Sequence, residues 1–116
     1  MKENLIQDKS FDFALLIIEL YKVLTERKEY ILSKQLLRSG TSIGANIEEA
    51  IAGQSKKDFL SKINISLKEA RETRYWLRLL ERSQLVELDY SRYLNESLSI
   101  INILTKIVKT TQASID

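Results

Sequence analysis

The chain has 116 residues and a mass of 13.5 kDa, which suits one domain and leaves too little for two separate cores. It contains no cysteine, histidine or proline and only three glycines. These absences exclude a disulfide framework, a thiolate nucleophile, an imidazole general base and the usual zinc and haem ligands. Hydrophobic residues make up 44% and charged residues 29%, as in soluble globular proteins, and the long stretches without proline favour helix.

The most apolar stretch, Phe11–Leu24, is interrupted by Asp12, Glu19 and Lys22. No window approaches the ~20 apolar residues of a bilayer span, and residues 1–8 lack the apolar core of a signal peptide. We therefore expect a soluble cytoplasmic protein that does not contact a membrane.

Hydrophobic periodicity and breakers predict four helices within a single domain, residues 1–116. The first is expected at 10–26, with Ser10 as its N-cap and an apolar arc of roughly 220° that would leave it nearly all buried. The second is expected at 29–52, ending before Gly53, and the third at 55–82, with Ser55 as its N-cap. The fourth is expected at 89–111. Because the connections are short, the fold predicted is all-α, an antiparallel up-and-down four-helix bundle.

The fourth predicted helix carries two apolar stripes offset by roughly 100°. One consists of Tyr90, Leu94, Leu98, Ile101 and Val108, and the other of Tyr93, Ile100, Ile103 and Ile107. A helix in one bundle needs a single stripe, so the second predicts contact with another copy of the chain. The alternative is a wider core within one chain.

Residues 35–50 are rich in small side chains, and they include Gly40 and Gly44 on one side of the second predicted helix. Each glycine costs a helix about 1 kcal/mol relative to alanine, which indicates close packing against another backbone. The alternative, an anion site built with Arg38, lacks the spacing of a phosphate-binding loop.

Four glutamates, Glu48, Glu49, Glu69 and Glu72, lie on the second and third predicted helices. A dimetal site on a bundle needs histidine beside such carboxylates, and the chain has none. A carboxylate-only magnesium or manganese site stays open as an alternative to ion pairs with Arg38, Arg71 or Arg74. We predict no metal site, no cofactor and no catalytic residue.

The basic charge is concentrated in residues 54–85, which hold eight of the 18 basic residues and four of the 16 acidic ones. Seven of these cations fall within an arc of roughly 120° on the third predicted helix: Lys56, Lys57, Lys68, Arg71, Arg74, Arg78 and Arg82. Arginine suits bidentate phosphate contacts, and Tyr75 in the same arc could stack on a base. The pattern therefore predicts a nucleic-acid surface.

A structural role for the same charges is equally consistent with the pattern. Leu60 and Leu67 share the arc, and Glu69, Glu72 and Glu81 lie within reach as ion-pair partners. The chain's pI of 8.8 is also just below that of dedicated nucleic-acid-binding domains.

Residues 35–50 (QLLRSGTSIGANIEEA), Asp58-Phe59 and residues 68–80 (KEARETRYWLRLL) closely resemble the 23S rRNA intervening-sequence proteins of bacteria. The similarity extends from Phe11 to about Val108. The resemblance implies a four-helix bundle that assembles into a ring-shaped homopentamer and has no recognised catalytic residues. It also implies fold and assembly roles for the residues that match the family motif, namely Arg38, Asn46, Glu49, Asp58, Glu69, Glu72, Tyr75 and Trp76.

The family name refers to reading frames within intervening sequences of ribosomal RNA genes. A related branch comprises accessory proteins of retroelements, which bind a reverse transcriptase and nucleic acid. The function predicted is thus a non-enzymatic, homo-oligomeric scaffold that associates with RNA. The alternative is a protein-interaction module that docks a partner enzyme such as a reverse transcriptase without touching nucleic acid.

Overall fold

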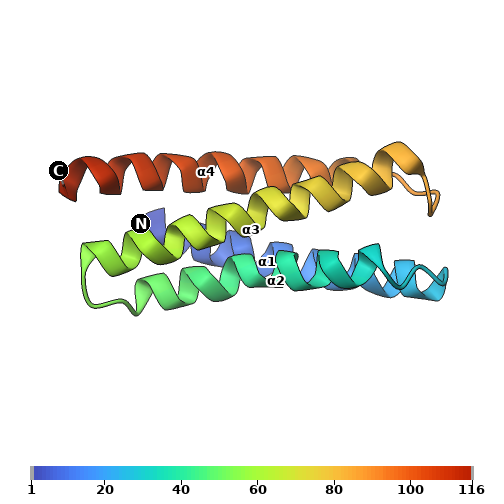
Figure 1. Ribbon diagram of the computed structural model, residues 1–116, viewed down its shortest axis with the longest axis horizontal. Coiled ribbons are helices and arrows are strands. Elements are labelled where there is room, and N and C mark those ends of the chain that lie inside the picture. The colour runs from blue at the N-terminus through green and yellow to red at the C-terminus, as the bar shows by residue number, and fades with distance from the viewer. Residues whose placement is uncertain (1, 116) are drawn as a thin grey trace.

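The computed structural model describes residues 2–115, and the side chains of residues 5–115. It contains the helices α1 (Lys2–Glu26), α2 (Leu32–Ile51), α3 (Lys56–Ser83) and α4 (Ser91–Ile115), and no strand occurs in this part of the chain. They form a rod of 47 × 21 × 21 Å (Figure 1). The predicted all-α, four-helix bundle is confirmed.

Neighbouring helices run antiparallel, and each packs on the next one in the chain. α1 meets α4 along a thinner contact that closes the bundle, whereas α1 and α3 lie on the diagonal and their backbones are not adjacent. The α1–α2 and α3–α4 connections lie at one end of the rod and the α2–α3 connection at the other (Figure 1). The outer faces of α1 and α3 are therefore separate surfaces of the molecule.

α1 begins at Lys2, eight residues before the predicted start, so the N-cap role predicted for Ser10 is wrong. Ser10 is buried inside the helix, and its hydroxyl donates to the Gln7 carbonyl at 3.0 Å. The helix continues toward the N-terminus because no breaker interrupts it and Ile6 extends its buried face. α1 is also less buried than predicted, since Phe11 and Leu15 are 63% and 49% exposed.

Glu29 organises the turn between α1 and α2. Lys28, at a φ of 67°, ends the turn that follows α1, and α2 starts at Leu32, not at the predicted residue 29. The buried Glu29 carboxylate accepts the backbone N–H groups of Ile31 and Leu32 at 3.0 Å and of Ser33 at 2.6 Å. It thereby satisfies three donors that the first turn of a helix leaves free.

The other helix ends lie close to the predicted positions. The Ser55 hydroxyl accepts the N–H of Asp58 at 3.1 Å, which confirms Ser55 as the N-cap of α3. Before α4, the Asp89 carboxylate accepts the N–H of Ser91 at 2.9 Å, and hydrogen bonds from the Ser91 side chain and backbone lower the pKa of that carboxyl. α4 extends four residues past its predicted end, to Ile115.

The second apolar stripe of α4 packs inside the chain. Ile100 and Ile107 are buried, and Tyr93 and Ile103 are half-buried against the same core. Ile100 and Ile107 therefore agree with the alternative of a wider core within one chain, because these side chains have almost no exposed surface to offer another copy. α4 needs two stripes because it contacts both α3 and α1.

Small polar side chains bring α2 close to α3. The Ser66 hydroxyl donates to the Ile43 carbonyl at 2.9 Å, and the hydroxyls of Ser39 and Thr73 form a hydrogen bond of the same length. All of these residues are buried.

Among the helices as described, none has an apolar stretch long enough to cross a bilayer.

Candidate nucleic-acid interface

Three arginines of α3 line a shallow groove between α3 and α4. Arg71, Arg74 and Arg78 are spaced three and four residues apart, so their side chains leave the same side of the helix. With Tyr75 and with Ile101 of α4 they enclose about 270 Å³. We call this feature, defined by these five residues, the arginine groove.

The other predicted cations lie along α3 outside the groove. Lys68 and Arg82 are exposed, about one helical turn before and after it. Lys57 is exposed near the start of α3, about 16 Å from Lys68 at 1.5 Å per residue. The structure thus gathers Lys68, Arg82 and the groove arginines into one surface and leaves Lys56 and Lys57 apart from it.

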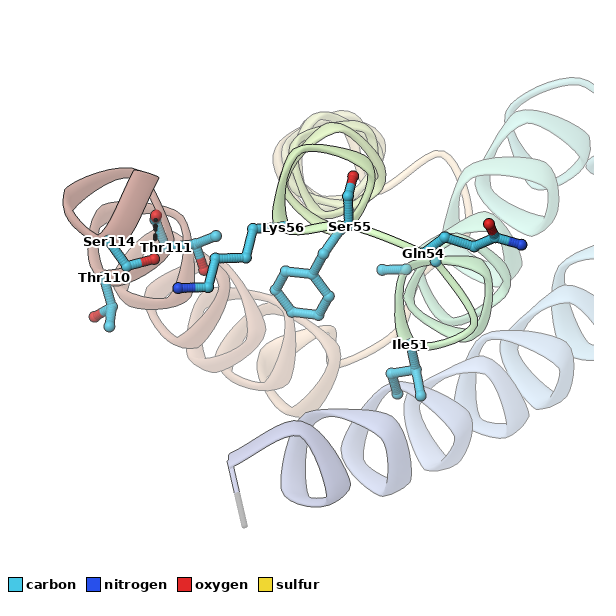
Figure 2. Close-up of a pocket in the computed structure, with 10 residues that line it drawn as sticks. Ile51, Gln54, Ser55, Lys56, Thr110, Thr111 and Ser114 are labelled. Carbon is cyan, nitrogen blue, oxygen red and sulfur yellow. Dashed lines mark hydrogen bonds between the residues drawn. The ribbon is translucent and has the colours of Figure 1, made fainter. Parts of the chain in front are cut away.

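Lys56 belongs to a different pocket, of about 470 Å³, between the α2–α3 connection and the end of α4. Figure 2 shows its side chain extended toward Thr111 and Ser114. The Ser114 hydroxyl donates to the Thr111 carbonyl at 2.9 Å, so it is already satisfied within the helix. Lys56 is the one charged residue that lines this wide, open pocket, and the pocket therefore lacks the several groups that a specific anion site needs.

The basic residues of α3 are not neutralised by the glutamates of the same helix. The ion pairs within residues 5–115 are Lys9–Glu96, Arg38–Glu69, Arg38–Glu72 and Lys62–Glu49. None of them includes the seven predicted cations. Glu69 and Glu72 pair with Arg38 of α2 instead, which leaves the positive charge of α3 facing solvent along the groove.

Arg74 has an unusual environment within the arginine groove. It is half-buried, and its Nε is the one buried side-chain polar atom without a hydrogen-bond partner in the described part of the chain. A buried donor without an acceptor costs about 1–3 kcal/mol, and more when the group is charged.

A series of hydrogen bonds and one ring contact connects Arg38 of α2 to Tyr75. Arg38 donates to both Glu69 and Glu72, and Oε2 of Glu72 also accepts the indole N–H of Trp76 at 3.0 Å. The rings of Trp76 and Tyr75 meet edge to face, with centroids 5.2 Å apart and planes at 70°. Tyr75 remains 53% exposed, so this support orients an aromatic ring beside the groove and leaves much of it accessible.

The four glutamates considered for a metal site are all engaged by other side chains. Glu48 accepts hydrogen bonds from Gln7, Glu49 pairs with Lys62, and Glu69 and Glu72 pair with Arg38. Within the described residues, no three carboxylates come together as a metal site would require.

Two features were not predicted from the sequence. Ile101 was assigned to the core stripe of α4, yet it also contributes to the arginine groove. At the opposite end from Lys56, the connections expose Tyr30, Ile31 and Leu85 at 61%, 76% and 61%. We call these three residues the end cluster. The sequence indicated it only by placing three large apolar residues in two short connections.

Comparison with known proteins identifies the fold and the lineage. A family model described as 23S rRNA-intervening sequence protein matches residues 2–106. A crystal structure from Bacteroides thetaiotaomicron, described as a protein of unknown function from the S23 ribosomal protein family, is 52% identical with a TM-score of 0.89. The similarity covers 94% of this chain and 99% of that one. Among curated proteins, none matches this chain.

Proposed function

We propose that this chain, which belongs to the 23S rRNA-intervening sequence protein family, is a non-enzymatic, cytoplasmic scaffold that binds RNA and works as a homo-oligomer. The RNA contact is assigned to the α3 surface formed by Lys68, Arg82 and the arginine groove.

The observation that carries the RNA-binding proposal is that Lys68, Arg82 and the groove arginines form no ion pair within the described residues. Arginines that stabilised α3 through ion pairs along the helix would lie beside its own glutamates. Here Glu69 and Glu72 pair with Arg38 of α2, and three guanidinium groups gather in a hollow with an exposed aromatic ring. Guanidinium forks match phosphate geometry, and phosphate contacts supply most of the affinity for nucleic acid.

Binding of a fluorescent structured RNA over a salt series tests this function. We expect an affinity that falls steeply with salt, and we expect Arg78→Glu with Arg82→Glu to abolish it while the oligomeric mass is unchanged. The matched control is Arg27→Glu with Lys28→Glu, which reverses two exposed charges in the α1–α2 connection. Absence of binding at low salt, or equal losses in both double variants, would contradict the proposal.

Self-association is assigned to the outer face of α1. Phe11 and Leu15 lie one turn apart there and are largely exposed, as Leu5 is. Asp8, Asp12 and Glu19 are exposed on the same helix, so this face repels RNA and is free to bind another copy. The family resemblance supports a homopentamer as the assembled form.

A protein partner is the second candidate, and the end cluster favours it. Tyr30, Ile31 and Leu85 border a hollow of about 320 Å³ together with Arg27 and Lys28. Ile31→Ser with Leu85→Ser should then abolish association with a partner enzyme, such as the reverse transcriptase of a retroelement, without altering RNA affinity. An unchanged association would remove this candidate.

A further inference from the structure

We propose that the arginine groove binds single-stranded nucleic acid, with a phosphate between its three guanidinium groups and the adjacent base stacked on Tyr75. This inference rests on the proposed RNA-binding function and names the form of nucleic acid that the site takes. The groove is about two helical turns long on α3. Attraction of phosphate needs only positive charge, whereas this inference also requires the ring of Tyr75 and the guanidinium group of Arg74.

The phosphate position follows from the charges and from Arg74. Arg71, Arg74 and Arg78 line one hollow of about 270 Å³, and none of them is in an ion pair within the described residues. Arg74 is half-buried at the edge of this hollow, and its Nε is buried without a hydrogen-bond partner. A phosphate oxygen is an anionic acceptor, and it would neutralise the cluster and accept hydrogen bonds from its guanidinium groups.

The base position follows from Tyr75. Its ring lines the same groove and is 53% exposed, whereas Trp76 holds it by an edge-to-face contact at 5.2 Å. Trp76 is in turn fixed by Glu72, and Glu72 by Arg38. A tyrosine that is oriented in this way loses little freedom when a base stacks on it, because its ring is already held in place.

These two positions together select a single strand. In a duplex the base faces are covered by their neighbours, so Tyr75 would gain no partner from it. A single strand presents phosphate and base face side by side, and aromatic stacking beside a basic groove is the usual way to bind it. An acidic peptide without aromatic residues would satisfy the arginines, but it offers no flat ring for Tyr75.

The test compares a 12-nucleotide oligouridine RNA with a blunt RNA duplex of equal charge, both at the same salt concentration. We expect the wild-type protein to bind the single strand more tightly. Tyr75→Ala should weaken single-strand binding about tenfold and leave duplex binding unchanged, while Tyr75→Phe keeps the affinity. Tyr30→Ala, which removes a similarly exposed tyrosine far from the groove, should have no effect.

Arg74→Lys supplies a second, independent variant. It keeps the positive charge but removes the planar guanidinium group and the buried Nε. The affinity for the single strand should therefore fall several-fold, while its salt dependence stays the same. Trp76 is the sole tryptophan, and we expect its fluorescence to change when the single strand binds but not when the duplex does.

Each contrary result has a distinct meaning. If wild-type protein binds neither RNA at low salt, the proposed function fails with the inference. If it binds both forms equally, or if Tyr75→Ala leaves single-strand binding intact, RNA binding stands and the inference is overturned. If polyglutamate displaces the single strand as strongly as RNA of equal charge does, the inference is also overturned, because the groove would then bind any polyanion.

Discussion

Ile17 of α1 lies so close to Gly40 of α2 that a Cβ added at Gly40 would sit 2.9 Å from Cγ2 of Ile17. The Ile17 side chain is fully buried and β-branched, so it has little room to turn away. At Gly44, one turn further along α2, a Cβ would lie 3.4 Å from its nearest neighbour, the Ser10 hydroxyl. The two glycines predicted to form one packing strip therefore differ in how tightly α1 covers them.

The difference predicts opposite effects of alanine at the two positions. Gly44→Ala should raise the free energy of unfolding by up to about 1 kcal/mol, because alanine favours helix and the site has space. Gly40→Ala should lower it by about 1 kcal/mol, because overpacking against Ile17 outweighs the same helix gain. Urea unfolding monitored by circular dichroism measures both. Equal effects of the two variants would show that helix propensity, not contact with α1, decides the outcome.

The Glu29 cap predicts a second stability effect. Glu29→Ala removes the acceptor for the N–H groups of Ile31, Leu32 and Ser33, and it should destabilise the protein by about 1–2 kcal/mol. Glu29→Gln keeps one acceptor oxygen and should cost less. The control is Glu26→Ala, since Glu26 is an exposed residue at the end of α1. Thermal unfolding distinguishes them, and similar melting temperatures for Glu29→Ala and Glu26→Ala would argue against the cap.

The turn at Glu29 also shows where sequence reasoning stopped. Periodicity identified all four helices and their antiparallel order, because apolar spacing and short connections determine both. It missed the true start of α2 because the cap comes from a glutamate that folds back over the helix end. That arrangement depends on a positive φ at Lys28, which no local residue pattern indicates.

The candidate site was predictable to a similar extent. Helical spacing alone placed Arg71, Arg74 and Arg78 on one side of α3. Which helix borders that side is a tertiary matter, so neither the groove with Ile101 nor the buried Nε of Arg74 could be foreseen. The pairing of Glu69 and Glu72 with Arg38 likewise depends on how α2 and α3 pack.

Tyr90 predicts a loss of stability at alkaline pH. Burial raises the pKa of its hydroxyl above the ordinary value of 10.0, and the nearby Glu29 carboxylate raises it further. The unfolded chain therefore releases this proton first as pH rises. The stabilisation that comes from the raised pKa of Tyr90 is fully present below pH 10.0. It is lost progressively as the pH rises from there through the pKa of Tyr90 in the folded protein.

Tyr90→Phe separates this effect from packing. The variant loses the hydrogen bond from the Tyr90 hydroxyl to the Val86 carbonyl, 2.7 Å long, and should be about 1 kcal/mol less stable at pH 7. Its stability should then fall less between pH 9.5 and 11 than that of the wild type. Urea unfolding across this pH range is the measurement, and parallel curves for the two proteins would contradict the assignment to Tyr90.

The exposed apolar face of α1 predicts a selective change in assembly. Phe11→Ser with Leu15→Ser should lower the oligomeric mass measured by light scattering, because each side chain contributes about 1.5–3 kcal/mol when a second copy covers it. Melting of the released protomer should remain cooperative, since neither residue belongs to the buried core. Ile31→Ser, at the more exposed end cluster, is the control and should leave the mass unchanged. Because α1 and α3 are diagonal helices with separate outer faces, each protomer of the double variant should keep its affinity for single-stranded RNA. Retention of the full oligomeric mass would place the self-association surface elsewhere.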